Sequence, residues 1–178
     1  NDPLSRDLAL IGVESVADVE AYEKMKIRLF NGAHSALAYL GQLSEIEYLA
    51  EAIVDPRIEV FIRDMQEKEI AKSFHVPLGV DLVAYAAQAR SRISNRSLFH
   101  RTSQVAMDGS QKLPQRLFSS ANDLHAQGIS PIRISFVIAA WIHYLSTSKN
   151  INDPLARELQ AFAGERGAKV AVEKILTI

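Results

Sequence analysis

The 178-residue chain contains no cysteine, and this absence excludes several kinds of site. Without a thiol there can be no disulfide, no thiolate nucleophile, and no zinc or iron–sulfur site held by cysteine. The lack of disulfides agrees with a reducing compartment, so we expect a cytoplasmic protein. Long apolar runs are also absent, because the longest extends only from Phe136 to Ile142, far short of the roughly 20 residues that cross a bilayer. We therefore expect no transmembrane helix.

The chain also lacks an excess of charge and a glycine-rich turn. Its 20 basic and 21 acidic residues give a net charge of -1, so we expect neither nucleic acid nor a membrane among its partners. Its eight glycines form no G-x-G-x-x-G, the phosphate-binding turn of a dinucleotide site. With 48% apolar residues, the chain can still bury the core of one ordinary domain. Because it does not begin with Met, we expect it to be part of a longer protein.

Apolar residues recur at three- and four-residue spacing along most of the chain, which predicts an all-α fold. The polar stretch 94–112 is expected to be a loop. NDPL occurs twice, at residues 1 and 152, and is interpreted as helix-start chemistry rather than as a repeat architecture. The expected capping residues are Asp55-Pro56, Asp81, Ser110, Ser130-Pro131 and Asp153-Pro154. The expected helices are 20–41, 45–53, 56–73, 81–94, 113–126, 131–147, 154–162 and 168–175.

The segment KIRLFNGAH at 26–34 places three polar residues in an apolar helix. At about 100° per residue, Lys26, His34 and Asn31 lie within an arc of about 140°, together with Phe30. Most of this helix is apolar around its circumference, so we expect Lys26 to be surrounded by protein. The expected solvated strip is Lys24, Arg28, Ser35 and Gln42.

Two interpretations of this polar trio remain open. In the structural one, Lys26 reaches the surface or pairs with Glu23, while Asn31 and His34 are satisfied core groups. In the functional one, the three form a carbonyl or alcohol site. Lys26 then exchanges a proton, Asn31 donates to an oxyanion and His34 binds a hydroxyl. A desolvated lysine is costly unless it is paired or used, but the spacing alone does not decide between the two interpretations.

Other polar residues give weaker signals. His75, His125 and His143 are far apart in sequence and show no metal-binding spacing, so we expect no metal site. The segment FVIAAWIHYL at 136–145 is typical of a core helix rather than of a cofactor site.

Two blocks of sequence resemble one enzyme family. K-x-x-x-x-N-x-x-H within YEKMKIRLFNGAHSALAYLG resembles the signature helix of the polyol-specific long-chain dehydrogenases, which include mannitol dehydrogenase and fructuronate reductase. HRTSQVAMDGSQKLPQR at 100–116 resembles a second block of that family, and the two blocks occur in the same order. The resemblance covers about residues 10 to 165. The chain is therefore similar to the helical C-terminal domain of that family, which itself resembles that of 6-phosphogluconate dehydrogenase.

The resemblance implies a role for each residue of the trio. Lys26 would be the general base in oxidation and the general acid in reduction, without zinc. Asn31 would stabilise the oxyanion and His34 would bind a neighbouring hydroxyl. The reaction would interconvert a polyol or aldonate with the corresponding ketose or ketouronate, using NAD or NADP. The cofactor would be bound mainly by an N-terminal Rossmann domain absent from residues 1–178, so we expect the isolated chain to be inactive.

The second block supplies two further candidates. Without the resemblance, DGSQK is interpreted as a turn and helix cap. With it, Lys112 and Arg101 become candidates for binding distal hydroxyls or a terminal carboxylate. The family often has Asn-Pro before this loop, whereas this chain has SNRSLFHRT, which affects the direction of His100 and Arg101. The alternative to an enzyme is a helical interaction module that has lost catalysis.

Overall fold

The computed structural model describes residues 10, 11, 16 and 18–164, and the regular secondary structure of this part of the chain is helical. Its one β contact is an isolated antiparallel bridge between Tyr48 and Arg101, so the all-α prediction is confirmed. No helix of these residues is long and apolar enough to span a membrane. The α-helices are α2 (Val19–Met25), α3 (Gly32–Leu43), α4 (Leu49–Ala52), α5 (Pro56–Asp64), α6 (Leu82–Ile93), α7 (Thr102–Val105), α8 (Gly109–Leu113), α9 (Ser119–Ala126), α10 (Ile132–Thr147) and α11 (Ala156–Ala163).

Several of these helices are joined or extended by short helical segments that are wider or narrower than an α-helix. Three are π-helical: η1 (Lys26–Asn31), η2 (Met65–Glu69) and η5 (Pro114–Phe118). They join α2 to α3, extend α5, and join α8 to α9. Two are 3₁₀-helical: η3 (Ile70–Lys72) and η4 (Arg96–Leu98).

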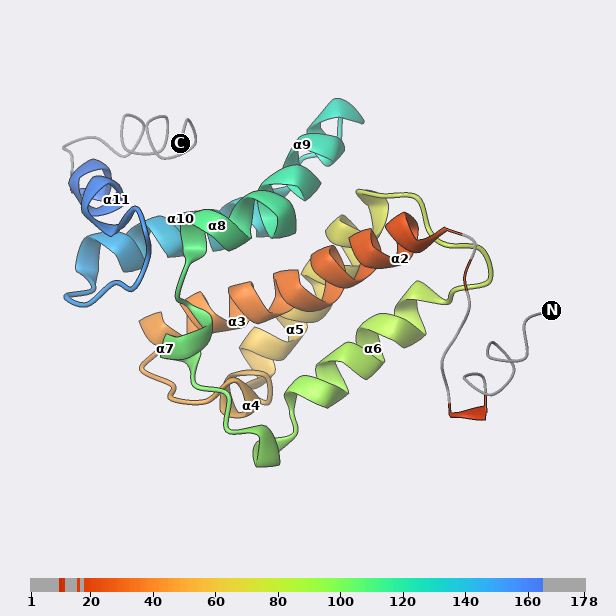
Figure 1. Ribbon diagram of the computed structural model, residues 1–178, viewed down its shortest axis with the longest axis horizontal. Helices are drawn as coiled ribbons and strands as arrows, with labels where there is room; N and C mark the ends of the chain where they lie inside the picture. The colour runs from red at the N-terminus through yellow and green to blue at the C-terminus, as the bar shows by residue number, and fades with distance from the viewer. Residues whose placement is uncertain (1–9, 12–15, 17, 165–178) are drawn as a thin grey trace.

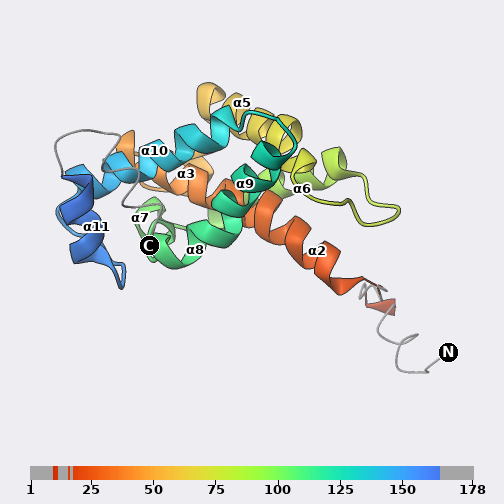
Figure 2. The same cartoon turned by 90° about the horizontal axis from the view of Figure 1, so that it is seen from above.

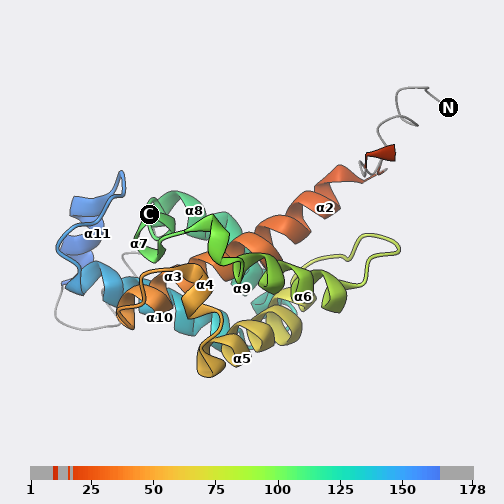
Figure 3. The same cartoon turned by 90° about the horizontal axis from the view of Figure 1, so that it is seen from below.

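The rod formed by α2, η1 and α3 runs through the middle of the molecule (Figure 1). Its α3 half is almost entirely buried, and Leu37 and Tyr39 belong to the core. α10 packs along α3, where the rings of Tyr39 and Tyr144 lie 5.6 Å apart, and its Val137 and Trp141 belong to the core, which confirms the predicted core helix. In contrast, the first turns of α2 project beyond the other helices (Figures 2 and 3).

Capping explains where several helices begin. Asp55 accepts hydrogen bonds from the backbone N–H groups of α5, and Asp81 does the same for α6, as predicted. The expected cap of α10 is wrong, because neither Ser130 nor Pro131 provides a side-chain bond. The buried carboxylate of Glu69, in η2, instead accepts hydrogen bonds from the first N–H groups of α10.

Most of the predicted helices are present, and two expectations need correction. The helix expected at 45–53 is only α4, preceded by a turn. The stretch expected as a loop, 94–112, contains η4, α7 and most of α8. The helix predicted at 168–175 and the first NDPL lie outside the described residues.

Candidate functional site

The KIRLFN segment forms the π-helical turn η1 rather than part of a regular α-helix. The N–H of Gly32 donates to the carbonyl of Ile27, five residues earlier, which defines this wider turn. Lys26 and Asn31, the first and last residues of η1, therefore lie at the two ends of this wider turn. The spacing of 100° per residue does not hold here, and π turns of this kind are frequent at functional sites.

Side chains from the two other π turns hold η1 in place. Gln66 of η2 is completely buried and donates to the carbonyl of Leu29 at 2.9 Å. Arg116 of η5 donates to the hydroxyl of Ser35 at 3.1 Å and approaches the carbonyl of Asn31 at 3.5 Å. The geometry of η1 therefore depends on residues distant in sequence.

The exposure of two basic residues is the reverse of the prediction. Lys26 was expected to be buried, but it is exposed, and its amine forms no hydrogen bond or ion pair with any described residue. Arg28 was expected in solvent, but only 5% of it is exposed. Its guanidinium donates to the carbonyl of Ser73 and forms an ion pair with Asp123, both at 2.6 Å. The π turn rotates the preceding residues, and α2 projects from the body.

A pocket of about 320 Å³ lies where η1 and α3 meet the segment around α7 and the helix formed by α8 and η5. It brings together three of the five predicted site residues: Asn31, His34 and Lys112. Lys26 and Arg101 do not line it. The complete lining is Phe30, Asn31, His34, His100, Gln104, Val105, Lys112 and Arg116.

His34 has a defined orientation and charge in this pocket. Its Nδ1 lies 2.9 Å from the carbonyl of Phe30. Because a carbonyl only accepts, Nδ1 must carry the hydrogen, which leaves Nε2 as the acceptor of a neutral ring. Burial lowers the pKa of His34 below 6.5, nearby His100 and Arg116 lower it further, and the bond to Phe30 acts in the opposite direction. The ring is therefore neutral at neutral pH.

His100 reaches the pocket because its segment pairs with the chain ahead of α4. The N–H of Leu49 donates to the carbonyl of His100, and the N–H of Thr102 donates to that of Glu47. The hydroxyl of Thr102, which is fully buried, donates to Ile46 at 2.7 Å. The ring of His100 then lies 6.5 Å from that of His34, centre to centre. The sequence did not predict this because the path of the segment depends on these long-range bonds.

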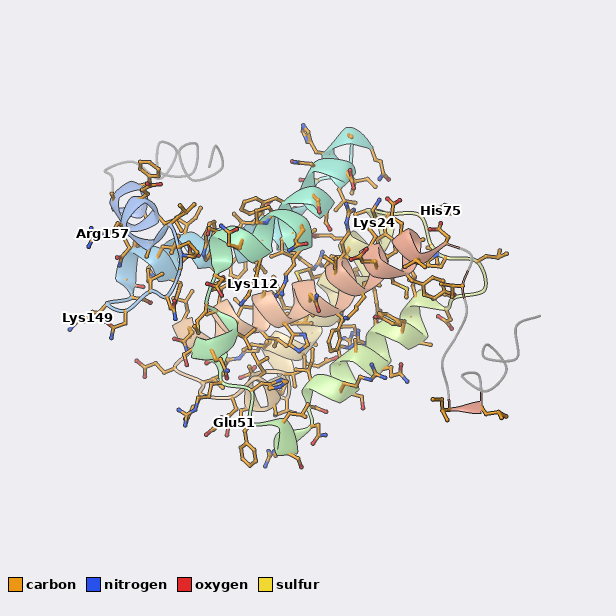
Figure 4. The ribbon with its side chains drawn as sticks, viewed as in Figure 1. Lys24, Glu51, His75, Lys112, Lys149 and Arg157 are labelled. Carbon is orange, nitrogen blue, oxygen red and sulfur yellow. The ribbon has the colours of Figure 1, made fainter. Side chains whose placement is uncertain are left out.

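Lys112 enters the pocket from α8, near the middle of the molecule and over α3 (Figure 4). Its amine donates to the carbonyl of Met107 at 2.7 Å, and burial lowers its pKa. Gly109 lets α8 approach the core, since a Cβ there would lie 2.6 Å from both Trp141 Nε1 and the Tyr39 hydroxyl. A close backbone contact therefore sets the position of Lys112.

Comparison with known proteins places the chain in a family. The mannitol dehydrogenase C-terminal domain family matches residues 18–178. The chain belongs to this family. It is 43% identical over 159 residues to D-mannonate oxidoreductase of Escherichia coli (strain K12), covering 84% of the chain and 32% of that protein. It is 35% identical over 167 residues to mannitol 2-dehydrogenase of Aspergillus terreus, covering 89% and 33% respectively.

A solved structure supports the same assignment. Pseudomonas fluorescens mannitol 2-dehydrogenase, in a ternary complex with NAD and D-mannitol, superposes with a TM-score of 0.87 at 31% identity, covering 96% of this chain and 35% of that one. The resemblance to the polyol dehydrogenases is therefore confirmed. The chain spans about a third of the length of the relatives that it matches.

In this member of the family, Arg101 does not line the pocket. Its guanidinium forms an ion pair with Glu47 at 2.7 Å and lies over the ring of Tyr48. Arg116 and Gln104, which were not predicted as site residues, line the pocket instead. Arg116 follows Lys112 by four residues, a spacing that places two side chains on the same face of a helix. This spacing could have identified Arg116 as a site residue from the sequence.

The described residues offer little to hold a metal or a dinucleotide. Among residues 10, 11, 16 and 18–164, no group of three or more His, Asp or Glu side chains converges on one point. The sequence contains no glycine-rich phosphate turn. The pocket residues are donors and acceptors suited to hydroxyl, carbonyl and carboxylate oxygens. The pocket is therefore suited to a small oxygen-rich molecule.

Proposed function

We propose that the chain is the substrate-binding and catalytic domain of an NAD(P)H-dependent oxidoreductase. The full-length protein would interconvert a polyol or aldonate with the corresponding ketose or ketouronate, without zinc. The observation that carries the proposal is the pocket that Asn31, His34 and Lys112 line together, next to the π turn that begins at Lys26. Family membership supports the same class of reaction, because the relatives are named as oxidoreductases of mannitol and mannonate.

Each residue has a distinct part in this proposal. Lys26 takes the hydroxyl proton during oxidation and returns it during reduction. The amide of Asn31 donates to the substrate oxygen as negative charge develops on it. Nε2 of neutral His34 accepts a hydrogen bond from a neighbouring substrate hydroxyl. The amine of Lys112 has donors left for a more distant oxygen. A nicotinamide held by the N-terminal domain would supply or accept the hydride.

The exposure of Lys26 places one requirement on the proposal. A lysine in water is protonated at neutral pH, so a general base must work in a dry environment. The described residues leave Lys26 exposed, and α2 projects from the body beside it. We infer that the nucleotide-binding domain covers this side of η1 in the full-length protein. Proton transfer would then depend on the joining of the two domains.

A second candidate is a non-catalytic helical interaction module. The same exposure of Lys26 favours it, since a surface lysine needs no catalytic role. The two candidates differ in what happens when the amine is removed.

The test is Lys26→Ala in the full-length protein. Turnover of mannitol or mannonate should fall by about 100-fold or more, because proton transfer loses its donor and acceptor. Lys24→Ala is the matched control, since Lys24 is a neighbouring exposed lysine that pairs with Glu20 at 3.7 Å. It should retain the turnover of the unmodified protein. Unchanged turnover in Lys26→Ala would refute the role of the lysine and leave the module as the better account.

A further inference from the structure

Arg116 is an exception among the arginines of this protein. The other described arginines that are buried or half-buried each form an ion pair with a carboxylate. Their partners lie within 2.6 to 3.4 Å: Arg28 with Asp123, Arg63 with Glu59, Arg90 with Glu67, and Arg133 with Asp64 and Glu69. Arg116 is half-buried, yet it has no carboxylate partner among residues 10, 11, 16 and 18–164. Its charge is therefore not neutralised within the described chain.

The unused donors of Arg116 are available to a ligand in the pocket. One terminal nitrogen serves Ser35 and approaches the carbonyl of Asn31, while Nε and the second terminal nitrogen have no partner among the described residues. Lys112 lies one turn earlier on the same helix and lines the same pocket. The side chains that line this pocket include two histidines but no carboxylate. The amine of Lys112 has the carboxylate of Asp108 at 3.8 Å, so Arg116 is the uncompensated cation on this side of the pocket.

Removing a cation from water is costly unless an anion compensates for the lost hydration. The planar guanidinium is well suited to a carboxylate, which accepts two parallel N–H bonds from it. A neutral polyol would leave this charge uncompensated. In addition, burial lowers the pKa of Arg116, which agrees with a site that is short of negative charge.

We propose that Arg116, assisted by Lys112, binds the carboxylate of a sugar acid, so that the substrate pair is an aldonate and its ketouronate rather than a polyol and a ketose. This inference rests on the proposed function, because it names the substrate class of the same pocket. The competing source of negative charge is a phosphate of the dinucleotide. The pocket itself favours the substrate, since Arg116 lines it together with Asn31 and His34.

The experiment compares D-mannonate with D-mannitol, which differ in one terminal group, as substrates of the full-length protein. The unmodified protein should prefer mannonate in kcat/KM. Arg116→Gln should lower kcat/KM for mannonate by about 10- to 100-fold, as expected for loss of a charged hydrogen bond, and change that for mannitol much less. The KM for NAD should stay constant. Arg116→Lys keeps the charge but loses the planar guanidinium, so its preference for mannonate over mannitol should lie between those of the unmodified protein and Arg116→Gln. This variant replaces Arg116→Gln in the test if the glutamine variant does not fold.

Two matched variants separate recognition from support of the π turn. Ser35→Ala removes one hydrogen-bond partner of Arg116 but leaves its charge, so the ratio of mannonate to mannitol turnover should not change. Arg92→Gln removes an exposed arginine on α6, outside the pocket, and should affect neither substrate.

Several outcomes would overturn the inference. A preference for mannitol in the unmodified protein would do so, as would an equal loss for both substrates in Arg116→Gln. A higher KM for NAD in that variant would indicate that Arg116 binds a phosphate of the cofactor instead of the substrate. By contrast, no turnover of either substrate by the unmodified protein would refute the proposed function itself.

Discussion

At the scale of single residues, the imidazole of His34 is held as a neutral hydrogen-bond acceptor. Its Nδ1–H is used by Phe30, and burial opposes a positive charge on the ring. The unfolded chain would hydrate the same ring freely. Proton uptake therefore distinguishes the two states, and stability should depend on pH through this residue.

The sign of this dependence follows from the lowered pKa of His34. Below pH 6.5, His34 binds a proton in the unfolded chain but remains neutral in the folded chain, so protonation favours unfolding. The contribution of neutral His34 to the free energy of unfolding is therefore complete above pH 6.5 and is lost as the pH falls towards the pKa of the folded state. We expect the free energy of unfolding to fall between about pH 7 and pH 5 more steeply in the unmodified chain than in His34→Gln. Urea denaturation at several pH values measures both. Parallel pH profiles would show that burial of His34 does not affect its protonation.

Some residue-level features could be predicted from the sequence and others could not. Spacing placed Asn31 and His34 on one face of a helix, and the resemblance to the polyol dehydrogenases added Lys112, so three of the selected side chains share a pocket. The environment of Lys26 was not predictable, because the angular position of each residue depends on the type of helical turn. That type is decided by partners such as Gln66, which is 37 residues away from the carbonyl it binds.

At the scale of secondary-structure elements, the three π turns form a connected polar system. Gln66 links η2 to η1, and Arg116 links η5 to η1. The guanidinium of Arg90, on α6, donates in turn to the amide oxygen of Gln66 at 2.8 Å. These bonds satisfy polar groups that burial would otherwise leave without partners. They keep η1 in the conformation that lines the pocket.

Glu69 provides a test of how the elements are held together. Its buried carboxylate accepts from the N–H groups of Arg133 and Ile134 at 2.9 to 3.1 Å and pairs with the guanidinium of Arg133. Glu69→Ala should therefore lower the free energy of unfolding by about 1–3 kcal/mol, because buried donors lose their acceptor. Glu158→Ala, at an exposed position on α11, is the control and should change it by less than about 0.5 kcal/mol. Equal effects in chemical denaturation would contradict the capping role of Glu69.

Helix positions were predictable where the sequence carries its own start signal. Asp55 with Pro56, and Asp81, act on the backbone two and three residues ahead, so local chemistry is enough. Within the stretch 94–112, Asn95 caps η4 in this local way, but neither α7 nor α8 has a side-chain cap. The order of this stretch comes from long-range bonds, such as those of Ser110 to the carboxylate of Asp153 at 2.6 and 2.8 Å. Polar composition alone therefore suggested a loop.

At the scale of the whole molecule, a well-packed helical body carries a partly exposed rod. The end formed by α2 projects from the body (Figures 2 and 3), and Lys26, which is exposed, directly follows α2 in the chain. The pocket is completed on three sides by η1 with α3, the segment around α7, and α8 with η5.

The isolated chain should therefore be unable to turn over its substrate. It has no glycine-rich turn for the pyrophosphate of a dinucleotide, and its proposed acid and base is exposed to water. We expect no NADH consumption by the 178-residue chain with fructose or fructuronate, and consumption by the full-length protein under the same conditions. Absorbance of NADH measures both. Turnover by the isolated chain would mean that it holds a dinucleotide site of its own.

The most direct measurement of the central claim is rescue of full-length Lys26→Ala by small primary amines. If the lysine acts only by exchanging a proton with the substrate oxygen, added amines should restore part of the lost turnover, in an order that follows their basicity. Lys24→Ala, assayed in the same amines, should show no gain. A Lys26→Ala protein that folds normally and recovers no activity with any amine would contradict the claim that Lys26 transfers the proton.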